Sequence, residues 1–486
     1  MDENIISLIA KELNIAISQV KNTLELLEEG ATVPFIARYR KERTKGLDEE
    51  QIRVIQENYA YQVNLAKRKE EVLARIETLG KLDDEIIKNV NACTKLSQVE
   101  DIYRPYKQKK KTRASVAIAN GLQPLADTLM SFPRYFKETE LDAYINENVK
   151  DREAAIQGAC DIIAEKVSDD VDVRNKILDS MTNFGRIVAS EKKDHEDDHK
   201  VYKMYYDYSE RVNTLAPHRV MAIDRGEKEK VLNVSISFNE EYIENWVCRR
   251  FIRFTNSGTS EYVRAAILDG LKRLAYPSIE RMVRSALSEK AHESSIDVFS
   301  MNLEKLLLQP PMKDKVILGF DPAFRTGCKL AVIDASGKKL TVDVIYPHQP
   351  NAKVRESEQK LVQLCNEYHV NLIAIGNGTA SRESEAFVAN TIKKFNLPVS
   401  YTIVSEAGAS VYSASKLAIE EFPDLHVEQR SAISIARRLM DPLSELIKID
   451  PQSIGVGQYQ HDMPPAQLDA TLSGVVEDCV NGVGVD

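Results

Sequence analysis

The sequence predicts a multidomain protein that combines an α-helical part with an α/β part. Three observations lead to this prediction. Apolar side chains recur every three or four residues through residues 1–190, as they do on the buried faces of helices. Strand and helix patterns then alternate between residues 316 and 449, which is typical of an α/β domain. The length of 486 residues fits about three domains of ordinary size.

The composition is that of a globular protein, with 43% hydrophobic and 29% charged residues. No apolar run approaches the ~20 residues that span a bilayer, and the first residues do not form a signal peptide. The six cysteines are scattered without a CxxC pair, so we expect free thiols and a cytoplasmic protein. Because the net charge is -9, binding to nucleic acid would have to rest on local basic patches.

The N-terminal region is predicted to be helical. One helix is expected from Ile5 to Leu13, a second ends at Gly30, and a longer one follows Asp48 and ends before Gly80.

The pattern changes in the middle of the chain. Two apolar runs, Val220–Ile223 and Val231–Ile236, flank the charged segment Arg225–Lys228, which predicts a β-hairpin. Helical spacing returns from Glu261 to Leu308, and two prolines follow it.

The α/β region begins with the segment KVILGFDPAFRTGCKLAVID. The apolar run Val316–Leu318 predicts a strand that is buried on both faces and ends at Asp321, just before a proline. A second strand is predicted from Lys329 to Asp334, closed by the turn Ala335–Lys338. A hairpin with an acid at the end of its first strand is how RNase H-like and RuvC-like nucleases begin.

Segments along nearly the whole chain resemble the Tex family of bacterial transcription accessory proteins. They are GFDPAFRTGCKLAVID, FIARYRKE, IYRPYKQKKKTRASVA, HRVMAIDRGEKE, IAIGNGTASRE, VSEAGASVYSAS and the run from Glu428 to Asp462. The resemblance implies a helical N-terminal region around a YqgF/RuvC-like domain of the RNase H fold. It also implies that the chain stops before or within a helix-hairpin-helix module and lacks the OB-fold RNA-binding domain that follows in the family.

On this basis four parts are expected. They are a helical N-terminal domain (1–200), a hairpin plus helical connecting region (201–312), the YqgF/RuvC-like domain (313–450), and a connection that begins the helix-hairpin-helix region (451–486).

The resemblance also implies a function, which is that of a nucleic-acid-binding scaffold in transcription. Its expected partners are RNA, DNA and RNA polymerase or other transcription machinery, with no membrane. A scaffold that binds only proteins remains an alternative, because the helical half offers broad surfaces and the chain is acidic.

A metal-dependent nuclease is the enzymatic alternative. RNase H-like enzymes need three or four carboxylates around one or two divalent ions. Asp321 supplies the first, but the strand 371–376 is followed by Asn377, whose amide oxygen is at best a weak ligand. Glu406 follows the next strand, and Asp441 is the last candidate, although it also fits a helix cap. This set is incomplete, so we expect no efficient hydrolysis, no cofactor and no metal site. Mg²⁺ or Mn²⁺ enters only if Asp321, Glu406 and Asp441 are catalytic.

A basic segment is the main candidate for binding nucleic acid. It places five positive charges in seven residues, namely Lys107, Lys109, Lys110, Lys111 and Arg113. These cations can neutralise phosphates, while Tyr103 and Tyr106 just upstream can stack on bases. A solvated basic loop remains the alternative interpretation.

The loop Gly376–Arg382 suggests a second anion site, because its small residues let backbone N–H groups approach a phosphate. Arg325 and Arg382 complete the candidate nucleic-acid contacts. The loop lacks the lysine of a Walker A motif, and an ordinary turn with Ser381 as the helix N-cap is the alternative.

Two other motifs are expected to be structural. The segment His195–His199 matches H-E-x-x-H, but it has no apolar residue nearby and no evident third ligand, so a solvated charged segment is expected. His461 and Asp462 have no serine or cysteine nucleophile at a suitable spacing, so a polar loop is expected there.

Overall fold

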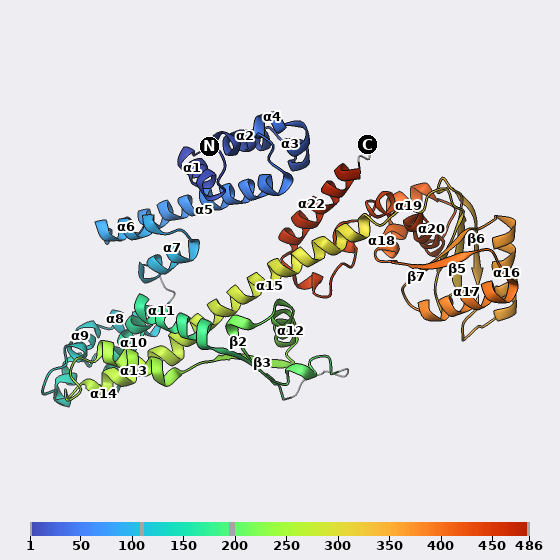
Figure 1. Cartoon of the computed structure of the whole chain (residues 1–486). Helices are drawn as coiled ribbons and strands as arrows, with labels where there is room; N and C mark the ends of the chain where they lie inside the picture. The colour runs from blue at the N-terminus through green and yellow to red at the C-terminus, as the bar shows by residue number, and fades with distance from the viewer. Residues whose placement is uncertain (1, 107–110, 194–199, 484–486) are drawn as a thin grey trace. The chain divides into compact units, whose positions relative to one another are not determined.

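The computed structural model describes residues 2–106, 111–193 and 200–483 (Figure 1). Its internal contacts divide the chain into two compact units, Met1–Ala291 and His292–Asp486. The predicted combination of helical and α/β parts is confirmed, because the first unit is mostly helical and the second contains a five-stranded mixed sheet. The four-part division expected from the sequence remains a prediction.

Four of the first five helices share one apolar core, and the short fourth helix packs against the second and the third. The five helices are α1 (Glu3–Glu12), α2 (Ile17–Glu28), α3 (Val33–Tyr39), α4 (Lys41–Thr44) and α5 (Glu49–Thr78). Ile9 and Ile52 are fully buried in that core. The long helix predicted after Asp48 is confirmed as α5, because the Asp48 carboxylate accepts the Gln51 N–H at 2.8 Å and caps the first turn.

Most of the remaining first unit is also helical. Its helices are α6 (Asp84–Ala92), α7 (Leu96–Tyr103), α8 (Arg113–Ala119), α9 (Gln123–Ser131), α10 (Arg152–Asp169), α11 (Val171–Asp179), α12 (Pro217–Lys228), α13 (Glu240–Phe251), α14 (Ser260–Asp269) and, as far as Ala291, α15 (Tyr276–Leu307). Helix α10 packs against α8, α9 and α14. The backbone at Gly270 comes so close to α10 that an added Cβ would lie 2.5 Å from the Ala164 carbonyl oxygen.

A three-stranded antiparallel sheet also belongs to this unit. Its order is β2-β1-β3, with β1 (Arg186–Glu191) between β2 (Asp207–Arg211) and β3 (Leu232–Ser237). The predicted hairpin is therefore wrong in its first half, because Val220–Ile223 lies inside α12. A short apolar run fits a buried strand or a buried helix equally well, and Pro217 in the first turn favours the helix.

The α/β domain in the second unit is built on a sheet of order β6-β5-β4-β7-β8. Its strands are β4 (Ile317–Asp321), β5 (Cys328–Ile333), β6 (Lys339–Ile345), β7 (Leu372–Gly376) and β8 (Ser400–Val404). The strands β6, β5 and β4 are antiparallel neighbours, while β7 and β8 run parallel to β4. The predicted hairpin of β4 and β5 is confirmed. Strand β6 was not predicted, and most of its residues are only partly buried.

Helices cover both faces of this sheet (Figure 1). Helices α16 (Val354–Glu367) and α17 (Ser381–Phe395) pack on the face that carries Leu318 and Phe320. Helix α20 (Val427–Met440) packs on the opposite face, where an added Cβ at Gly319 would lie 2.0 Å from the Ala432 carbonyl oxygen. The absence of a side chain at Gly319 is therefore what lets α20 lie directly on β4.

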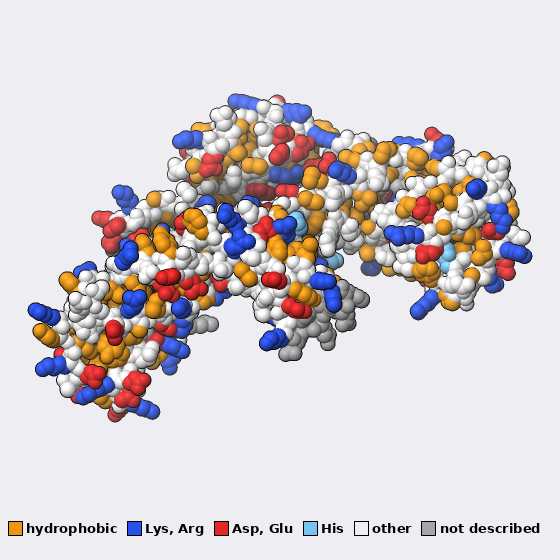
Figure 2. Space-filling model, turned by 60° about the horizontal axis from the view of Figure 1, so that its bottom comes forward, with side chains coloured by type: hydrophobic (Ala, Val, Ile, Leu, Met, Phe, Trp, Pro, Cys, Tyr) orange, Lys and Arg blue, Asp and Glu red, His pale blue; other side chains and the backbone are white. Residues whose placement is uncertain are grey.

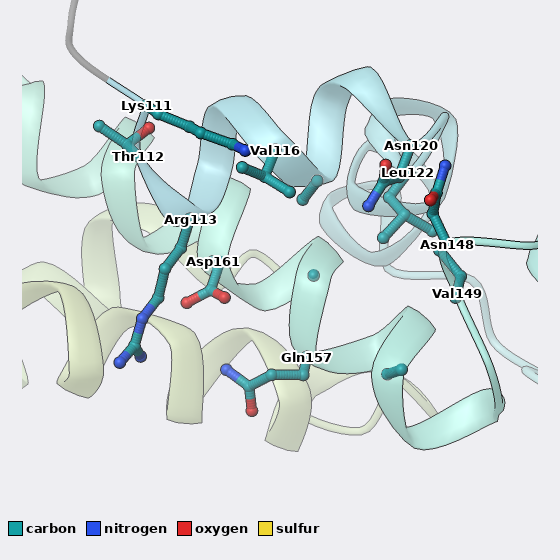
Figure 3. A pocket seen from close by; sticks show the side chains of 13 residues that line it. Lys111, Thr112, Arg113, Val116, Asn120, Leu122, Asn148, Val149, Gln157 and Asp161 are labelled. Atoms are coloured by element: carbon teal, nitrogen blue, oxygen red, sulfur yellow. The ribbon is translucent and has the colours of Figure 1, made fainter.

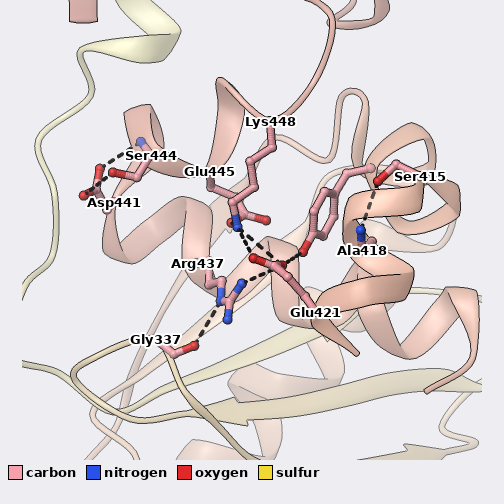
Figure 4. A network of polar contacts seen from close by, with 10 residues as sticks. Gly337, Ser415, Ala418, Glu421, Arg437, Asp441, Ser444, Glu445 and Lys448 are labelled. Carbon is pink, nitrogen blue, oxygen red and sulfur yellow. Dashed lines mark hydrogen bonds and ion pairs between the residues drawn. The ribbon is translucent and has the colours of Figure 1, made fainter. Parts of the chain in front are cut away.

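Short helices complete the domain, and a charged network joins them (Figure 4). They are α18 (Ala409–Ala414), α19 (Lys416–Glu421) and α21 (Pro442–Leu446). The Glu421 carboxylate accepts hydrogen bonds from the Tyr412 hydroxyl, from Arg437 Nη1 at 3.2 Å and from Lys448 Nζ at 3.1 Å. Arg437 also donates to the Gly337 carbonyl at 2.9 Å, which ties α20 to the turn between β5 and β6.

The C-terminal segment ends in α22 (Pro465–Val483), in agreement with the helical pattern predicted from Leu468. Before it, the chain lies against the part of α15 that belongs to the second unit. An added Cβ at Gly457 would come within 1.7 Å of the Phe299 ring, and Asn302 donates to the Val456 carbonyl at 2.9 Å. The helix-hairpin-helix module remains a prediction. Among the described residues, no helix is long and apolar enough to cross a membrane.

Candidate functional site

Asp321 stands at the end of β4, as predicted, and is partly buried. It faces Lys329 across the antiparallel pair of β4 and β5. Burial is the main reason why its pKa is raised to about 6, and the nearby carboxylate of Glu406 adds to the rise. A hydrogen bond from the Ser431 side chain and the positive charge of Lys329 act in the opposite direction.

Lys329 is the residue at this site that sequence reasoning missed. Only 4% of it is exposed, and its Nζ lies 2.5 Å from Glu428 Oε2. The same ammonium donates to Thr326 Oγ1 at 2.6 Å and to the Thr326 carbonyl at 3.1 Å. The available signal was a lysine inside a strand whose other residues are buried and uncharged. Glu428, at the start of α20, was also not predicted as a site residue.

Glu406 follows β8 and comes near Asp321, so the structure brings these two predicted acids together. Its pKa is raised chiefly by burial, while a hydrogen bond from the Gly378 backbone and the positive charge of Arg438 oppose the rise. An added Cβ at Gly378 would lie 1.5 Å from Glu406 Oε1, so this glycine is what lets the carboxylate approach the backbone. Arg438 is almost fully buried and donates hydrogen bonds to the carbonyls of Ser405 and Ala407.

The amide oxygen of Asn377 is not free to act as a metal ligand. Its Oδ1 accepts the backbone N–H of Glu406 at 3.0 Å, so the amide oxygen holds the following acid in position.

Asp441 does not join the acid cluster, which consists of Asp321, Glu406 and Glu428. It is the N-cap of α21, where it accepts the Ser444 hydroxyl at 2.8 Å and the Ser444 N–H at 3.2 Å. Ser431 contacts Asp321 near the start of α20, and ten residues of helix separate it from Asp441, a rise of about 15 Å. The structure shows Asp441 as a helix cap at the C-terminal end of α20, and its role as a third catalytic acid stays a prediction.

These residues do not fit a two-metal centre. Positive charge from the chain already acts on the acids near Asp321, since Lys329 pairs with Glu428 and Arg438 lowers the pKa of Glu406. Among the residues that the structure describes, no group of three or more His, Cys, Asp or Glu side chains is arranged to hold a metal ion. Mg²⁺ needs several oxygen ligands in near-octahedral geometry, and a buried ammonium stands beside the acids that would supply them.

The loop after β7 does not form an open phosphate cradle. The Gly378 N–H is bonded to the Glu406 carboxylate, so an internal anion already holds it. The N-cap of α17 is Ala380, with a φ of +64°, and the proposed N-cap Ser381 is instead the first helical residue. Arg325 and Arg382 are exposed, and neither forms an ion pair in the described part of the chain.

The basic segment is described only in part. Lys107, Lys109 and Lys110 lie outside the described residues. Lys111 and Arg113 are exposed and line a pocket of about 500 Å³ beside α8 (Figure 3). Tyr103 is buried in an apolar cluster with the Arg68 guanidinium 5.7 Å from its ring centroid, so it does not offer a free face to a base.

On the face shown in Figure 2, Lys and Arg side chains are scattered among Asp and Glu. Contacts with nucleic acid therefore have to be sought at local sites such as the pocket at α8. The H-E-x-x-H segment His195–His199 lies outside the residues that the structure describes. His461 is exposed in a short 3₁₀ turn, as expected for a polar loop.

Comparisons with known proteins cover most of the chain. Residues 3–77 match the model of the Tex-like protein N-terminal domain, residues 133–299 match the Tex central region, and residues 315–440 match the Tex protein YqgF-like domain. This last match agrees with the RNase H-like arrangement of β4 to β8.

Three relatives illustrate the similarity. An uncharacterized protein YdcI of Bacillus subtilis is 51% identical over 98% of this chain and 67% of its own length. The transcriptional accessory protein Tex of Neisseria gonorrhoeae is 41% identical over 99% of this chain and 64% of its own length. The S1 RNA-binding domain-containing protein 1 of Homo sapiens is 35% identical over 100% of this chain and 50% of its own length. The chain thus spans between half and two thirds of these relatives.

Proposed function

The chain belongs to the Tex family, and on that premise we propose that it is a nucleic-acid-binding scaffold in transcription that does not hydrolyse its ligand. Its partners on this proposal are RNA or DNA together with RNA polymerase or other transcription machinery. A relative is named a transcriptional accessory protein, which supports this assignment.

The observation that carries the proposal is the buried ammonium of Lys329. It lies 2.5 Å from Glu428 and next to Asp321, where it supplies positive charge that metal ions supply in an RNase H-like nuclease. A lysine neutralises carboxylates but cannot activate water as a metal does. The fold can therefore persist as a stable binding unit after its chemistry is lost.

Binding is proposed to use cations that have no internal partner. Lys111, Arg113, Arg325 and Arg382 are exposed, and none has an ion pair within the described residues. Each can neutralise a phosphate and release a counter-ion from the nucleic acid, which makes binding depend on salt.

A metal-dependent nuclease is the second candidate. It is favoured by one observation, since Asp321 and Glu406 are close neighbours whose pKa values are both raised, as acids in active sites often are. In this case Lys329 would have to withdraw before metal ions could enter.

The test combines cleavage and binding. Single-stranded and duplex RNA and DNA are incubated with the protein in Mg²⁺, in Mn²⁺ and in EDTA, and affinity is then measured against salt concentration. We expect no cleavage above background, and an affinity that falls linearly in a plot of log K against log salt.

The control variants separate the two candidates. Cleavage that Asp321→Asn abolishes and Asp441→Asn retains would overturn the proposal in favour of the nuclease, because only Asp321 lies in the acid cluster. Failure of the wild-type protein to bind any of the four ligands would overturn the proposed binding.

A further inference from the structure

A pocket of about 500 Å³ lies within the first unit, between α8, the first half of α10 and the turn around Asn148 (Figure 3). Ligand pockets for small molecules typically measure about 300–1,000 Å³, so this pocket can hold a single planar ring system with its substituents. It belongs to a different unit from the acid cluster.

Apolar side chains line the pocket from two sides. Val116 and Leu122 line it from the α8 side, and Val149 and Ala154 line it from the other. Gly158 lets α10 pack closely against Leu122, because an added Cβ there would lie 2.3 Å from Leu122 Cδ1. Apolar walls of this kind favour the flat face of an aromatic ring.

The rim of the pocket carries amides. Asn120 and Asn148 lie together at one end in Figure 3, beside Leu122 and Val149. An amide side chain has both donors and an acceptor, which matches the mixed hydrogen-bonding edge of a nucleobase. At the other end Asp161 pairs with Arg273 at 3.0 Å and with the Gln157 amide, so its negative charge is compensated.

Two cations border the same pocket. Figure 3 shows Lys111 extended along α8 toward Val116, and Arg113 near Asp161. Asp161 attracts Arg113, but neither cation forms an ion pair within the described residues. An exposed cation beside an uncharged slot suits a ligand that joins an aromatic ring to an anionic group.

We propose that this pocket receives one base of a single-stranded nucleic acid, with the neighbouring phosphates held by Lys111 and Arg113. The inference rests on the proposed binding function and adds to it a defined contact with a base. It makes binding depend on unpaired bases, which duplex nucleic acid keeps stacked inside the helix.

The experiment compares two labelled single-stranded oligonucleotides of equal length by fluorescence anisotropy. One carries bases and the other consists of abasic units, so both have the same phosphates. We expect the wild-type protein to bind the base-bearing strand about tenfold more tightly, as for a single stacked base.

Three variants test whether the pocket causes the preference for the base-bearing strand. Ala154→Leu fills the pocket from an exposed helical position and should remove most of the preference, and Asn148→Ala should reduce it. Ala119→Leu is the matched control, because Ala119 is exposed on α8 and does not line the pocket. The slope of affinity against salt should stay unchanged in all three variants.

The outcomes distinguish this inference from the proposed function. Equal wild-type affinity for the two strands, or a full preference in both Ala154→Leu and Asn148→Ala, would overturn the base pocket while leaving phosphate binding in place. Absence of salt-dependent binding to either strand would instead overturn the proposed function on which the pocket depends.

Discussion

The acid cluster of the α/β domain and the pocket beside α8 differ in whether their charged side chains are buried and paired. In the cluster, Lys329 is buried and paired with Glu428 at 2.5 Å. At the pocket, Lys111 and Arg113 are exposed without an ion pair in the described residues. A charge that is buried and paired fixes local structure, whereas an exposed charge without an ion pair is available to bind a ligand. The acid cluster is therefore a weak candidate for a catalytic centre, although it resembles one. The pocket is the stronger candidate for a ligand-binding site.

Removing the buried cation should have the largest effect. In Lys329→Met the side-chain volume is mostly kept, but Asp321 and Glu428 lose the positive charge between them. We expect the free energy of local unfolding of β4 and β5 near pH 8 to fall by about 3–5 kcal/mol, with Mn²⁺ restoring part of it. Hydrogen exchange of the β4 and β5 amides measures this change.

Lys339→Met is the matched control, because Lys339 begins β6 in the same sheet and forms no ion pair in the described part. If Lys329→Met and the wild-type protein respond alike to Mn²⁺, then Lys329 does not occupy the place of a cation.

The protonation of Asp321 should give a smaller effect of opposite sign. Its pKa is about 6 in the folded protein and about 3.9 in an unfolded chain. Between these values the folded state holds a proton that the unfolded state has released, so stability falls as pH rises from about 4 to 6 and then stays low. Since Asn cannot ionise, Asp321→Asn should be more stable than the wild-type protein near pH 8 by about 3 kcal/mol and should lack this fall.

A pH series of hydrogen exchange checks this prediction. Asp334→Asn provides the contrast, because hydrogen bonds with Ser336 lower the pKa of Asp334 and its contribution is lost as pH falls. Parallel pH profiles for Asp321→Asn and the wild-type protein would contradict the raised pKa.

Removing the exposed cations should affect binding without affecting the fold. The double variant Lys111→Ala/Arg113→Ala should bind single-stranded nucleic acid about tenfold more weakly. Its salt slope should be reduced by about 1.4, because two phosphate contacts are lost and each contributes about 0.7 on a single strand. Titration at several salt concentrations measures both quantities. The double variant Lys21→Ala/Lys81→Ala removes the same charge from exposed positions away from the pocket, and an equal loss in that protein would show that only net charge matters.

The smallest effect is expected at Asp441. Asp441→Ala removes the N-cap of α21 and should lower local stability by about 1 kcal/mol, with no change in the response of the domain to Mn²⁺. Asp424→Ala removes an exposed acid that caps no helix and should be neutral. A metal response that changes in Asp441→Ala would place this residue in the acid cluster after all.

The features that sequence predicted correctly depend on neighbours along the chain. The long helix after Asp48 follows from a cap and a repeated spacing, and the end of β4 at Asp321 follows from an apolar run and a proline. The prediction that failed, a strand at Val220–Ile223, concerns a run too short to show its period.

The amino-acid sequence alone thus determined the family, the combination of helical and α/β parts, and the acid at the end of β4. Only the tertiary structure decided that Lys329 reaches Glu428, that Asp441 lies at the far end of α20, and that Tyr103 is buried. The reason is physical. Helix spacing and caps involve residues within one or two turns, whereas the partner of a buried charge is chosen by strand register and helix packing between distant parts of the chain.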